Sequence, residues 1–498
     1  MIPTRYIACD LGAESGRVML GTLENGKLSL EELHRFPNGP IGVPGFMHWD
    51  VVRMFDEVKA GIRKVAGRGK PVAGISCDSW GVDYVLLQGA GPFLTPPFHY
   101  RDPRTDGGLE RAFSVVPAEE IFAETGIQFM SINTLYQLLA DLRDRPDVLG
   151  AAERFLTIGD YFNSLLSGVA KAEESLASTT QLFNPLRKAW STTLIGKFGL
   201  PARIFPEVVP SGTVLGLLLP DLSEQTGLHD ASIVAGCSHD TGAAVAAVPS
   251  EGKGWAYLSS GTWSLLGVER TVPIINNASR GFNFTNELGF GGSVRFLKNI
   301  AGLWIIQECR RSWLKDGKEY SYDDLMGMAG EAAPLKAFID PMDPGFTRPD
   351  DMPRSIADFC RSTNQPVPGT PGGIVRCVLE SLALVYRRTM DQLEEVTGEK
   401  LNTIHIVGGG SKNRLLNRLT ANATGRTVQA GPIECTAIGN ILIQAIALGH
   451  LSSLEAARGI VRRSFPMERY EPAGKMLWED AWNRFRQFTQ SSPTKTIS

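Results

Sequence analysis

Two segments far apart in the chain share one pattern of apolar and small residues. Residues 6–10 and 17–23 are mostly apolar and flank a turn of small residues at 11–16. Residues 254–258 and 263–268 repeat this arrangement around the turn at 259–262. Each segment predicts a β-hairpin. The repetition favours a duplicated architecture with a nucleotide between two sheets, although strand–turn–strand units are common in α/β proteins.

The remaining periodicity predicts strands that alternate with helices. Apolar residues recur at helical spacing from Gly373 to about Val396 and from Asn299 to about Leu314, and another helix is expected to begin near Arg414. This alternation is typical of an α/β fold. The polar stretch at 248–254 predicts a domain boundary, and the tail at 490–498 is expected to fray. Further short apolar runs predict strands at residues 71–77, 84–87 and 401–407.

The composition narrows the class of protein. A chain of 498 residues is too long for one hydrophobic core and predicts two domains of about 200–250 residues. Its 43% hydrophobic and 21% charged residues are ordinary for a globular protein. The net charge of −3 gives no reason to expect nucleic acid or an anionic membrane as a partner. The sequence holds no run of about 18 apolar residues, so no transmembrane helix is predicted.

The cysteines and the N-terminus bear on the compartment. The seven cysteines are scattered without C-x-x-C spacing, which argues against a zinc site. The strand pattern begins within the first residues, so we expect no signal peptide. The odd number of cysteines then favours reduced thiols in the cytoplasm, with a disulfide left open.

The turn of the first hairpin is a candidate phosphate loop. Two glycines within residues 10–17 permit tight turns, where exposed backbone N–H groups can bind an anion. Ser15 and Arg17 can add donors to phosphate oxygens. Asp10 at the strand end can hold a hydrated Mg²⁺. Glu14 is expected to point to solvent, and a plain hairpin turn is the alternative interpretation.

Two later segments are further candidates for phosphate or nucleotide contacts. Residues 259–264 offer four hydroxyls and a glycine, which can donate to phosphate oxygens without adding charge. The run of three glycines at 408–410 follows a predicted strand and would let the backbone approach a ring or a phosphate. It lacks the G-x-G-x-x-G and Walker spacings, which counts against those two classes of site.

The segment at residues 238–244 combines an acidic residue with small side chains near mid-chain. Asp240 is the candidate general base, because an ordinary aspartate is ionised at pH 7 and can take a hydroxyl proton late in phosphoryl transfer. Its alternative role is an N-cap of the helix that follows. His239 is able to bond a substrate hydroxyl, although most single histidines are structural.

The segment at residues 78–83 can frame a sugar. Trp80 offers an apolar face, Gly81 lets the backbone reach hydroxyls, and Asp78 or Asp83 can accept hydrogen bonds from them. Residues 101–105 add polar groups in a loop.

Together these segments resemble the FGGY family of carbohydrate kinases, within the superfamily of sugar kinases, Hsp70 and actin, and most of all its ketose-specific branch. The resemblance covers nearly the whole chain in order. It runs through residues 34–39, 78–84, 100–105, 126–129, 133–138, 238–241, 258–267, 297–304, 405–413 and 430–434. It implies two duplicated actin-like (ribonuclease H-like) ATPase domains with a cleft between them, at residues 1–247 and 248–498.

The resemblance also implies roles for individual residues. Asp240 would be the catalytic base, and Asp10 would hold Mg²⁺. The residues expected to hold ATP are Ala13, Glu14, Ser15, Gly16, Arg17, Thr262, Gln307 and Gly410. The residues expected to bind the ketose are Gly81, His239, Asp240, Thr241 and Asn299. The expected reaction transfers the γ-phosphoryl group of ATP to the 1-hydroxyl of L-rhamnulose, in L-rhamnose breakdown.

Other substrates and functions remain open at this point. L-fuculose, L-ribulose and L-xylulose differ from L-rhamnulose in few features, and discrimination depends on where the hydroxyl partners lie. A non-catalytic sugar or nucleotide sensor would not need Asp240. An actin- or Hsp70-like ATPase is disfavoured because no peptide-binding region is recognisable. The expected partners are the small-molecule substrates, and the chain is expected to be a monomer or a homodimer.

Overall fold

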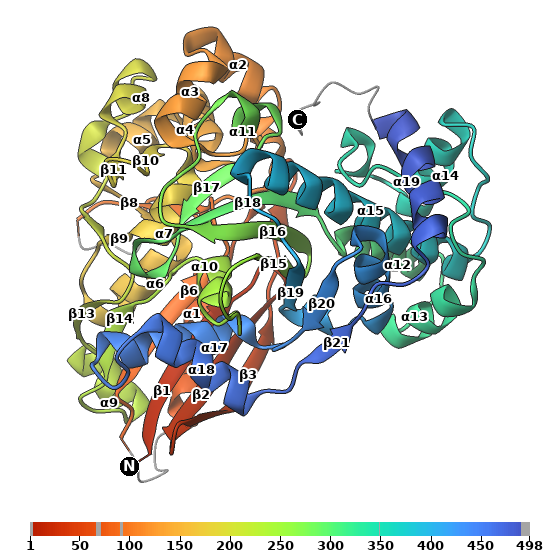
Figure 1. Ribbon diagram of the computed structural model, residues 1–498. Helices are drawn as coiled ribbons and strands as arrows, with labels where there is room; N and C mark the ends of the chain where they lie inside the picture. The colour runs from red at the N-terminus through yellow and green to blue at the C-terminus, as the bar shows by residue number, and fades with distance from the viewer. Residues whose placement is uncertain (1–2, 66–70, 90–92, 348, 490–498) are drawn as a thin grey trace.

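The computed structural model describes residues 3–65, 71–89, 93–347 and 349–489, so the predicted fraying at 490–498 lies outside the described residues. Two large β-sheets, each with its own helices, build the molecule (Figure 1). The first sheet is formed by the N-terminal half of the chain, and the second by the C-terminal half.

The first sheet is built around the first predicted hairpin. Its strand order is β13-β14-β6-β1-β2-β3, in which β1 pairs antiparallel with β2 and parallel with β6. The predicted strands at 6–10 and 17–23 are confirmed, and the strand predicted at 71–77 is confirmed from Gly74 onward. The strands are β1 (Thr4–Leu11), β2 (Ser15–Glu24), β3 (Lys27–Pro37), β6 (Gly74–Ser79), β13 (Thr213–Leu217) and β14 (Ser232–Ala235).

The second sheet repeats this pattern around the second hairpin. Its strand order is β17-β18-β16-β15-β19-β20-β21, and β15 again pairs antiparallel with its hairpin partner β16 and parallel with β19. The shared order and strand directions confirm the predicted duplication. The strands are β15 (Trp255–Ser260), β16 (Trp263–Arg270), β17 (Thr285–Leu288), β18 (Val294–Ala301), β19 (Thr403–Val407), β20 (Thr427–Ala430) and β21 (Glu468–Tyr470).

The remaining elements surround these sheets. Four short ribbons pair β4 (Ile41–Val43) with β5 (Phe46–His48), β7 (Tyr84–Leu87) with β8 (Arg154–Thr157), β9 (Ala172–Glu173) with β12 (Val208–Val209), and β10 (Phe183–Asn184) with β11 (Ala189–Trp190). The helices of the first half are α1 (Val51–Arg63), α2 (Gly108–Val115), α3 (Ala118–Thr125), α4 (Thr134–Asp144), α5 (Pro146–Ala151), α6 (Ile158–Ser167), α7 (Glu174–Ala177), α8 (Thr192–Lys197), α9 (Pro220–Thr226) and α10 (Asp240–Ala246). Those of the second half are α11 (Asn277–Gly281), α12 (Trp304–Lys315), α13 (Tyr322–Glu331), α14 (Met352–Ser362), α15 (Pro371–Thr397), α16 (Arg414–Thr424), α17 (Cys435–Ala447), α18 (Leu454–Ser464) and α19 (Lys475–Thr489).

One predicted helix is wrong in its first part. The helix expected from Asn299 begins only at Trp304, and Asn299 lies in strand β18. Residues 294–301 pair with β16 on one side, and residues 294–297 pair with β17 on the other, so sheet pairing overrides the local helical spacing. A Cβ at Gly302 would collide with the backbone of the β15–β16 turn, which shows how closely the end of β18 approaches that turn.

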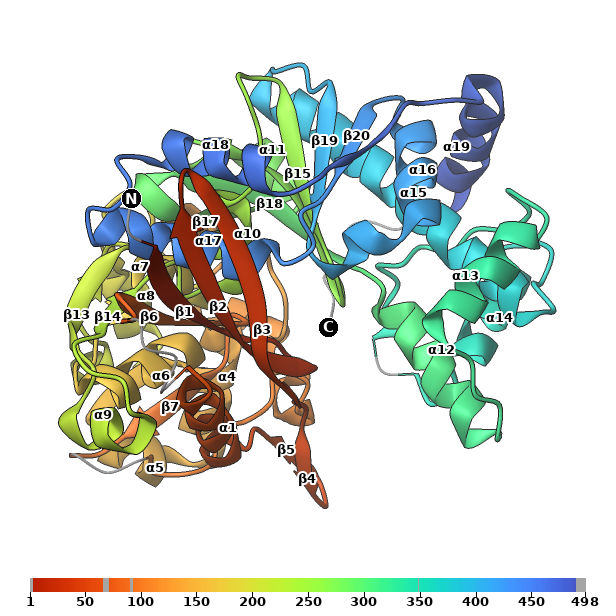
Figure 2. The same cartoon turned by 90° about the horizontal axis from the view of Figure 1, so that it is seen from below.

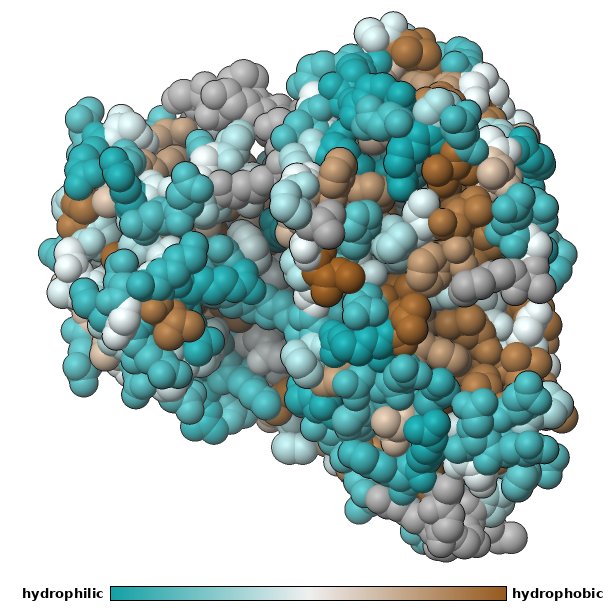
Figure 3. Space-filling model, turned by 180° about the vertical axis from the view of Figure 1, so that it is seen from behind, coloured by the Kyte–Doolittle hydropathy of each residue, from teal (hydrophilic) through white to brown (hydrophobic). Residues whose placement is uncertain are grey.

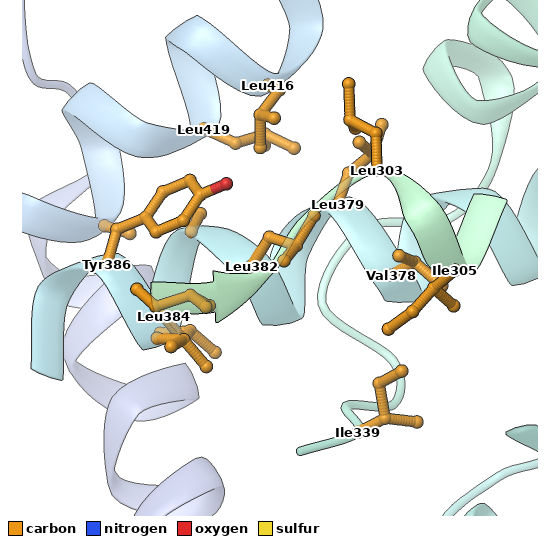
Figure 4. Close-up of a cluster of buried hydrophobic side chains, with 14 of the residues drawn as sticks. Leu303, Ile305, Ile339, Val378, Leu379, Leu382, Leu384, Tyr386, Leu416 and Leu419 are labelled. Atoms are coloured by element: carbon orange, nitrogen blue, oxygen red, sulfur yellow. The ribbon is translucent and has the colours of Figure 1, made fainter. Parts of the chain in front are cut away.

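The long helix α15 is the centre of the core of the second half, as the apolar periodicity from Gly373 predicts. Its apolar side chains are buried on several faces. Figure 4 shows them between Leu416 and Leu419 of α16 on one side and Ile339 on the other. The hydroxyl of Tyr386 lies 2.6 Å from Ser264 Oγ on β16, so the helix is also bonded to the sheet.

The two halves are joined by helices that cross between them. Helix α17 follows β20 in the second half but packs on β1 and β6 of the first sheet and on α10 (Figure 2). Gln444 Nε2 donates to the carbonyl of Ile7, and Asn440 Nδ2 donates to Asp78 Oδ2 at 2.6 Å. The helices approach so closely that a Cβ at Gly439 would overlap the carbonyl of Ala243. Only glycine permits this contact.

The surface seen in Figure 3 is mostly hydrophilic and the cysteines are buried, as expected for a globular protein. Hydrophilic residues cover most of the face seen in Figure 3, and hydrophobic residues gather in a band on its larger lobe. All seven cysteines are buried and free. No helix in the described part of the chain is long and apolar enough to cross a membrane.

The helix contact predicts the effect of one methyl group. Gly439→Ala forces α17 away from α10 and should lower the free energy of unfolding by about 1–3 kcal/mol, a usual cost of overpacking. The matched control is Gly330→Ala in α13, where a Cβ meets nothing within 4 Å. The control should leave stability equal or raise it by about 0.5–1 kcal/mol. Denaturant unfolding of both variants measures the difference, and equal stability would contradict the account of the contact.

Candidate active site

One cavity lies between the halves of the molecule, and a second adjoins it within the C-terminal half. The first has a volume of about 340 Å³ and is lined by the turn of each hairpin and by the start of α10. The second, of about 660 Å³, lies between α12, α13 and the glycine-rich turn after β19. Both are lined by Gly261, Thr262 and Gly409, so a ligand long enough to pass these residues can occupy both.

Most of the predicted site residues line these cavities. The first cavity contains Asp10, Ala13, Glu14, Ser15, Arg17, Gly81, His239, Asp240, Thr241, Thr262 and Asn299. The second contains Thr262, Gln307 and Gly410. Gly16 lines neither, and a Cβ there would overlap the ring of Phe36, so this glycine serves the packing of β2.

Asp240 is the first residue of α10 and faces the first cavity. Its Oδ1 accepts from the backbone N of Thr241 at 2.5 Å and from Thr241 Oγ1 at 3.1 Å. His239 Nε2 lies 3.3 Å from the same oxygen. The N-cap position belongs to His239, so the N-cap alternative for Asp240 is wrong. Burial raises the pKa of Asp240, while His239 opposes that shift.

Asp10 is the second-last residue of β1 and lines the same cavity. Its carboxylate is paired with Arg17, which also pairs with Glu434. Asp78 lies beside Asp10 in the sheet register, is fully buried and has an Oδ1 without a hydrogen-bond partner. Burial raises the pKa of Asp78 well above its usual value, and Asp10 and Asp240 add to the shift.

These carboxylate oxygens are the chemistry that Mg²⁺ prefers, and Mg²⁺ usually keeps several waters. Within the described residues no group of three or more His, Cys, Asp or Glu is placed to hold a metal ion. The assignment of Mg²⁺ to Asp10 stays a prediction.

Glu14 joins the two sides of the cleft. Its side chain is 41% exposed, as a solvent-facing residue would be, but it also accepts from Gln307 Nε2 at 3.0 Å and lies 3.4 Å from Arg311. Burial raises the pKa of Glu14, and Arg311 opposes the shift. The first predicted phosphate loop is therefore bonded directly to α12, which lines the second cavity.

The third glycine of the run at 408–410 is needed for a close approach. A Cβ at Gly410 would overlap the side chain of Ser260, at the end of β15. The turn after β19 and the turn of the second hairpin therefore lie against each other, which places both beside the second cavity.

Asp83 is buried behind the wall of the first cavity and bonds to residues that line it, Trp80 and Tyr100. Its Oδ2 accepts from Trp49 Nε1 at 2.6 Å and from Trp80 Nε1 at 2.9 Å. Tyr100 N donates to the same oxygen, and Gln137 Nε2 donates to Oδ1. Burial raises the pKa of Asp83 to about 6, although these hydrogen bonds counteract the shift.

The prediction that Asp78 or Asp83 accepts hydrogen bonds from a sugar is therefore wrong, because neither side chain lines the cavity. Both side chains are fully buried and are bonded to protein groups. Trp80 and Gly81 line the cavity as predicted.

Sequence reasoning missed Gln128 as a site residue. Its Oε1 accepts from the backbone N of Asn299 at 2.8 Å and from Asn299 Nδ2 at 3.2 Å, and its Nε2 donates to the carbonyl of Asn299. The bond joins the two halves across the first cavity. In the sequence, only the family resemblance at residues 126–129 pointed to this segment. The residues next to Gln128 give no sign that its side chain bonds to Asn299, which is 171 residues away.

The paired sheets and the cleft define an actin-like ATPase fold, and solved kinases share it. Gluconate kinase from Lactobacillus acidophilus superposes with a TM-score of 0.80 at 17% identity, covering 99% of both chains. Plasmodium falciparum glycerol kinase with ADP superposes with a TM-score of 0.77 at 15% identity, covering 98% of this chain and 99% of that one. The predicted fold is confirmed.

The sequence comparisons identify the family. The N-terminal domain of the FGGY family of carbohydrate kinases matches residues 5–247, and its C-terminal domain matches residues 256–448. The chain belongs to the FGGY family of carbohydrate kinases, and it is a carbohydrate kinase. The rhamnulokinase of Bacteroides thetaiotaomicron is 42% identical over 481 residues, 97% of this chain and 98% of that protein. The rhamnulokinase of Oceanobacillus iheyensis is 43% identical over 465 residues, 93% and 97% of the two chains.

The Asp83 cluster predicts a pH-dependent signal. Tryptophan fluorescence should change as the pH falls through about 6, because Asp83 is then protonated and no longer accepts equally from Trp49 and Trp80. His99 stacks near Trp49, but burial lowers its pKa to about 3, so it stays neutral in this range.

Two variants assign that signal. Asp83→Asn should abolish the transition near pH 6. Asp50→Asn, next to Trp49 in sequence, should retain it, because Asp50 caps α1 and pairs with Arg53, whereas both indoles donate to Asp83. A transition that persists in Asp83→Asn would contradict the assignment. Circular dichroism of both variants verifies that they are folded.

Proposed function

We propose that this kinase transfers the γ-phosphoryl group of ATP to the 1-hydroxyl of L-rhamnulose, in the breakdown of L-rhamnose. The observation that carries the proposal is the place of Asp240, in a cavity that adjoins a second one at the turn of the second hairpin and the glycine-rich turn after β19. The substrate comes from the relatives, which are named rhamnulokinases at about 40% identity over nearly the full chain. L-fuculose and other ketoses with similar hydroxyl patterns are the alternatives.

Asp240 acts as the general base. Its recorded hydrogen bonds fall on Oδ1, which among the described residues leaves Oδ2 for the hydroxyl of the substrate. As the hydroxyl oxygen forms its bond to the γ-phosphorus, the bond from that phosphorus to the bridging oxygen of ADP breaks, and the proton passes to Oδ2. Phosphoryl transfer has a loose transition state, so the carboxylate mainly orients the hydroxyl and takes its proton late.

The ketose would lie against Trp80 and Gly81, with His239, Thr241 and Asn299 as hydroxyl partners. An apolar ring face beside a few fixed polar groups is the usual composition of a sugar-sized pocket. Gln128 holds the amide of Asn299, which leaves the Asn299 Oδ1 to accept from the sugar.

ATP would reach from the second cavity into the first. Gln307 and Gly410 would lie along the nucleoside, and residues 13–17 and Thr262 would hold the phosphates through backbone N–H groups and hydroxyls. Arg17 would contact phosphate after leaving its pairing with Glu434. Asp10 would hold Mg²⁺ through waters, and the ion would neutralise charge on the phosphates.

Other expectations remain predictions. The division into domains at residues 1–247 and 248–498 is supported by the two family matches. We also expect a cytoplasmic location, no nucleic-acid or membrane partner, and a monomeric or homodimeric state.

The substrate is tested by coupled ADP release with Mg-ATP against a panel of ketoses. We expect kcat/KM for L-rhamnulose to exceed that for L-fuculose, L-ribulose and L-xylulose. A higher value for another ketose would keep the kinase mechanism but replace the substrate. Folded protein without any ketose-dependent ADP release would instead favour the sensing or ATPase alternatives.

The base is tested by Asp240→Asn, which keeps the size of the side chain but cannot take the proton. We expect kcat to fall about 10²–10⁴-fold, the usual contribution of a general base. Binding of ATP and of L-rhamnulose, followed by calorimetry, should stay close to that of the unchanged protein. Asp358→Asn on the exposed face of α14 is the matched control and should leave kcat unchanged. Normal turnover in Asp240→Asn would refute the assignment.

A further inference from the structure

A buried ion pair lies directly behind the catalytic segment. Glu287 on β17 and Arg295 on β18 are opposite each other in the sheet register. Arg295 is completely buried, and its Nη1 lies 3.1 Å from Glu287 Oε2. Its Nε and Nη2 donate to the carbonyl of Leu288 at 3.1 and 3.0 Å. The guanidinium group is therefore fixed in one position by neighbours from its own sheet.

Arg295 also touches His239. Its Nη2 lies 3.0 Å from His239 Nδ1. A guanidinium group has only donors, so Nδ1 must be the acceptor in this bond and carries no hydrogen. A neutral imidazole then has its hydrogen on Nε2. That nitrogen lies 3.3 Å from Asp240 Oδ1.

Two other groups contact His239. Glu287 Oε2 lies 3.4 Å from His239 Nδ1. Burial, the largest single effect, raises the pKa of Glu287, but Arg295, His239 and Asn299 together lower it below its usual value. An ionised Glu287 accepts only, so it would favour a hydrogen on Nδ1 and competes with Arg295 for that nitrogen. The contact from Arg295 is the shorter of the two, at 3.0 Å against 3.4 Å. The backbone of His239 is held separately, because its N donates to Ser175 Oγ at 3.1 Å.

We propose that Arg295, fixed by Glu287 and the Leu288 carbonyl, is a positioning residue that keeps His239 in the tautomer with its hydrogen on Nε2. His239 then donates toward Asp240 and the reacting hydroxyl from the side of the cleft. This donation occupies Oδ1 of Asp240 and orients Oδ2 toward the substrate. The role of Arg295 in turnover rests on the proposed function, whereas the tautomer of His239 does not.

The test removes the ion pair without leaving a charge behind. Arg295→Met alone would bury an unpaired Glu287 carboxylate, so the variant is the double change Arg295→Met with Glu287→Met. The matched control is Arg376→Met with Glu380→Met, which removes another largely buried pair, on α15. The first readout is long-range ¹H–¹⁵N NMR of ¹⁵N-histidine-labelled protein without ligands, in which a His239→Gln sample assigns the signal. The second is kcat and KM in the ADP-release assay.

In the unchanged protein we expect the hydrogen of His239 on Nε2. In the double variant we expect the signal to shift toward the other tautomer and kcat to fall about 10–100-fold, the range seen for residues that orient metal-bound histidines. KM for ATP should change little. The control should keep both the tautomer and kcat.

A hydrogen on Nδ1 in the unchanged protein would overturn the proposal. The proposal would also be overturned if the double variant kept either its tautomer or its kcat. It would be overturned as well if the control variant changed its tautomer and lost kcat. The proposed function fails separately, when the unchanged protein releases no ADP with any ketose while the NMR spectrum still reports the tautomer.

Discussion

The contact between α10 and α17 is the constraint on which the cleft depends. Each helix follows a strand of a different sheet, and they meet where Gly439 lies against the carbonyl of Ala243. Because α10 begins at Asp240, the position of this contact sets the position of the carboxylate in the first cavity. Asn440 and Gln444 on α17 then bond the same helix to β6 and β1. The cleft is thus held by the packing of two helices rather than by a flexible linker.

Three acidic side chains lie close together at the floor of the cleft. Asp10, Asp78 and Asp240 lie close enough for each other's charge to raise the pKa of Asp78, beyond the larger effect of its burial. The protein offsets part of this cost with Arg17 and with the amide of Asn440. In the proposed reaction the same negative charge attracts a hydrated cation, and Asp240 remains a carboxylate able to take a proton.

The sequence was most informative where local patterns decide the structure. The hairpin strands, α15 and the small-residue turns follow from apolar spacing and from glycines, which act over a few residues. The helix expected from Asn299 failed because pairing with β16 and β17 outweighs local spacing. The Asp83 cluster could not be predicted, since Trp49, Tyr100 and Gln137 come together only in the fold.

The central claim is that Asp240 receives the proton of the hydroxyl that attacks the γ-phosphate. A crystal structure with L-rhamnulose and a non-hydrolysable ATP analogue tests it most directly. The account predicts the 1-hydroxyl within about 2.6–3.2 Å of Asp240, a hydrogen-bond distance. It also predicts the γ-phosphate between residues 13–17 and the turn of the second hairpin. A sugar bound with its C1 away from Asp240, or a γ-phosphate outside these two turns, would contradict the account.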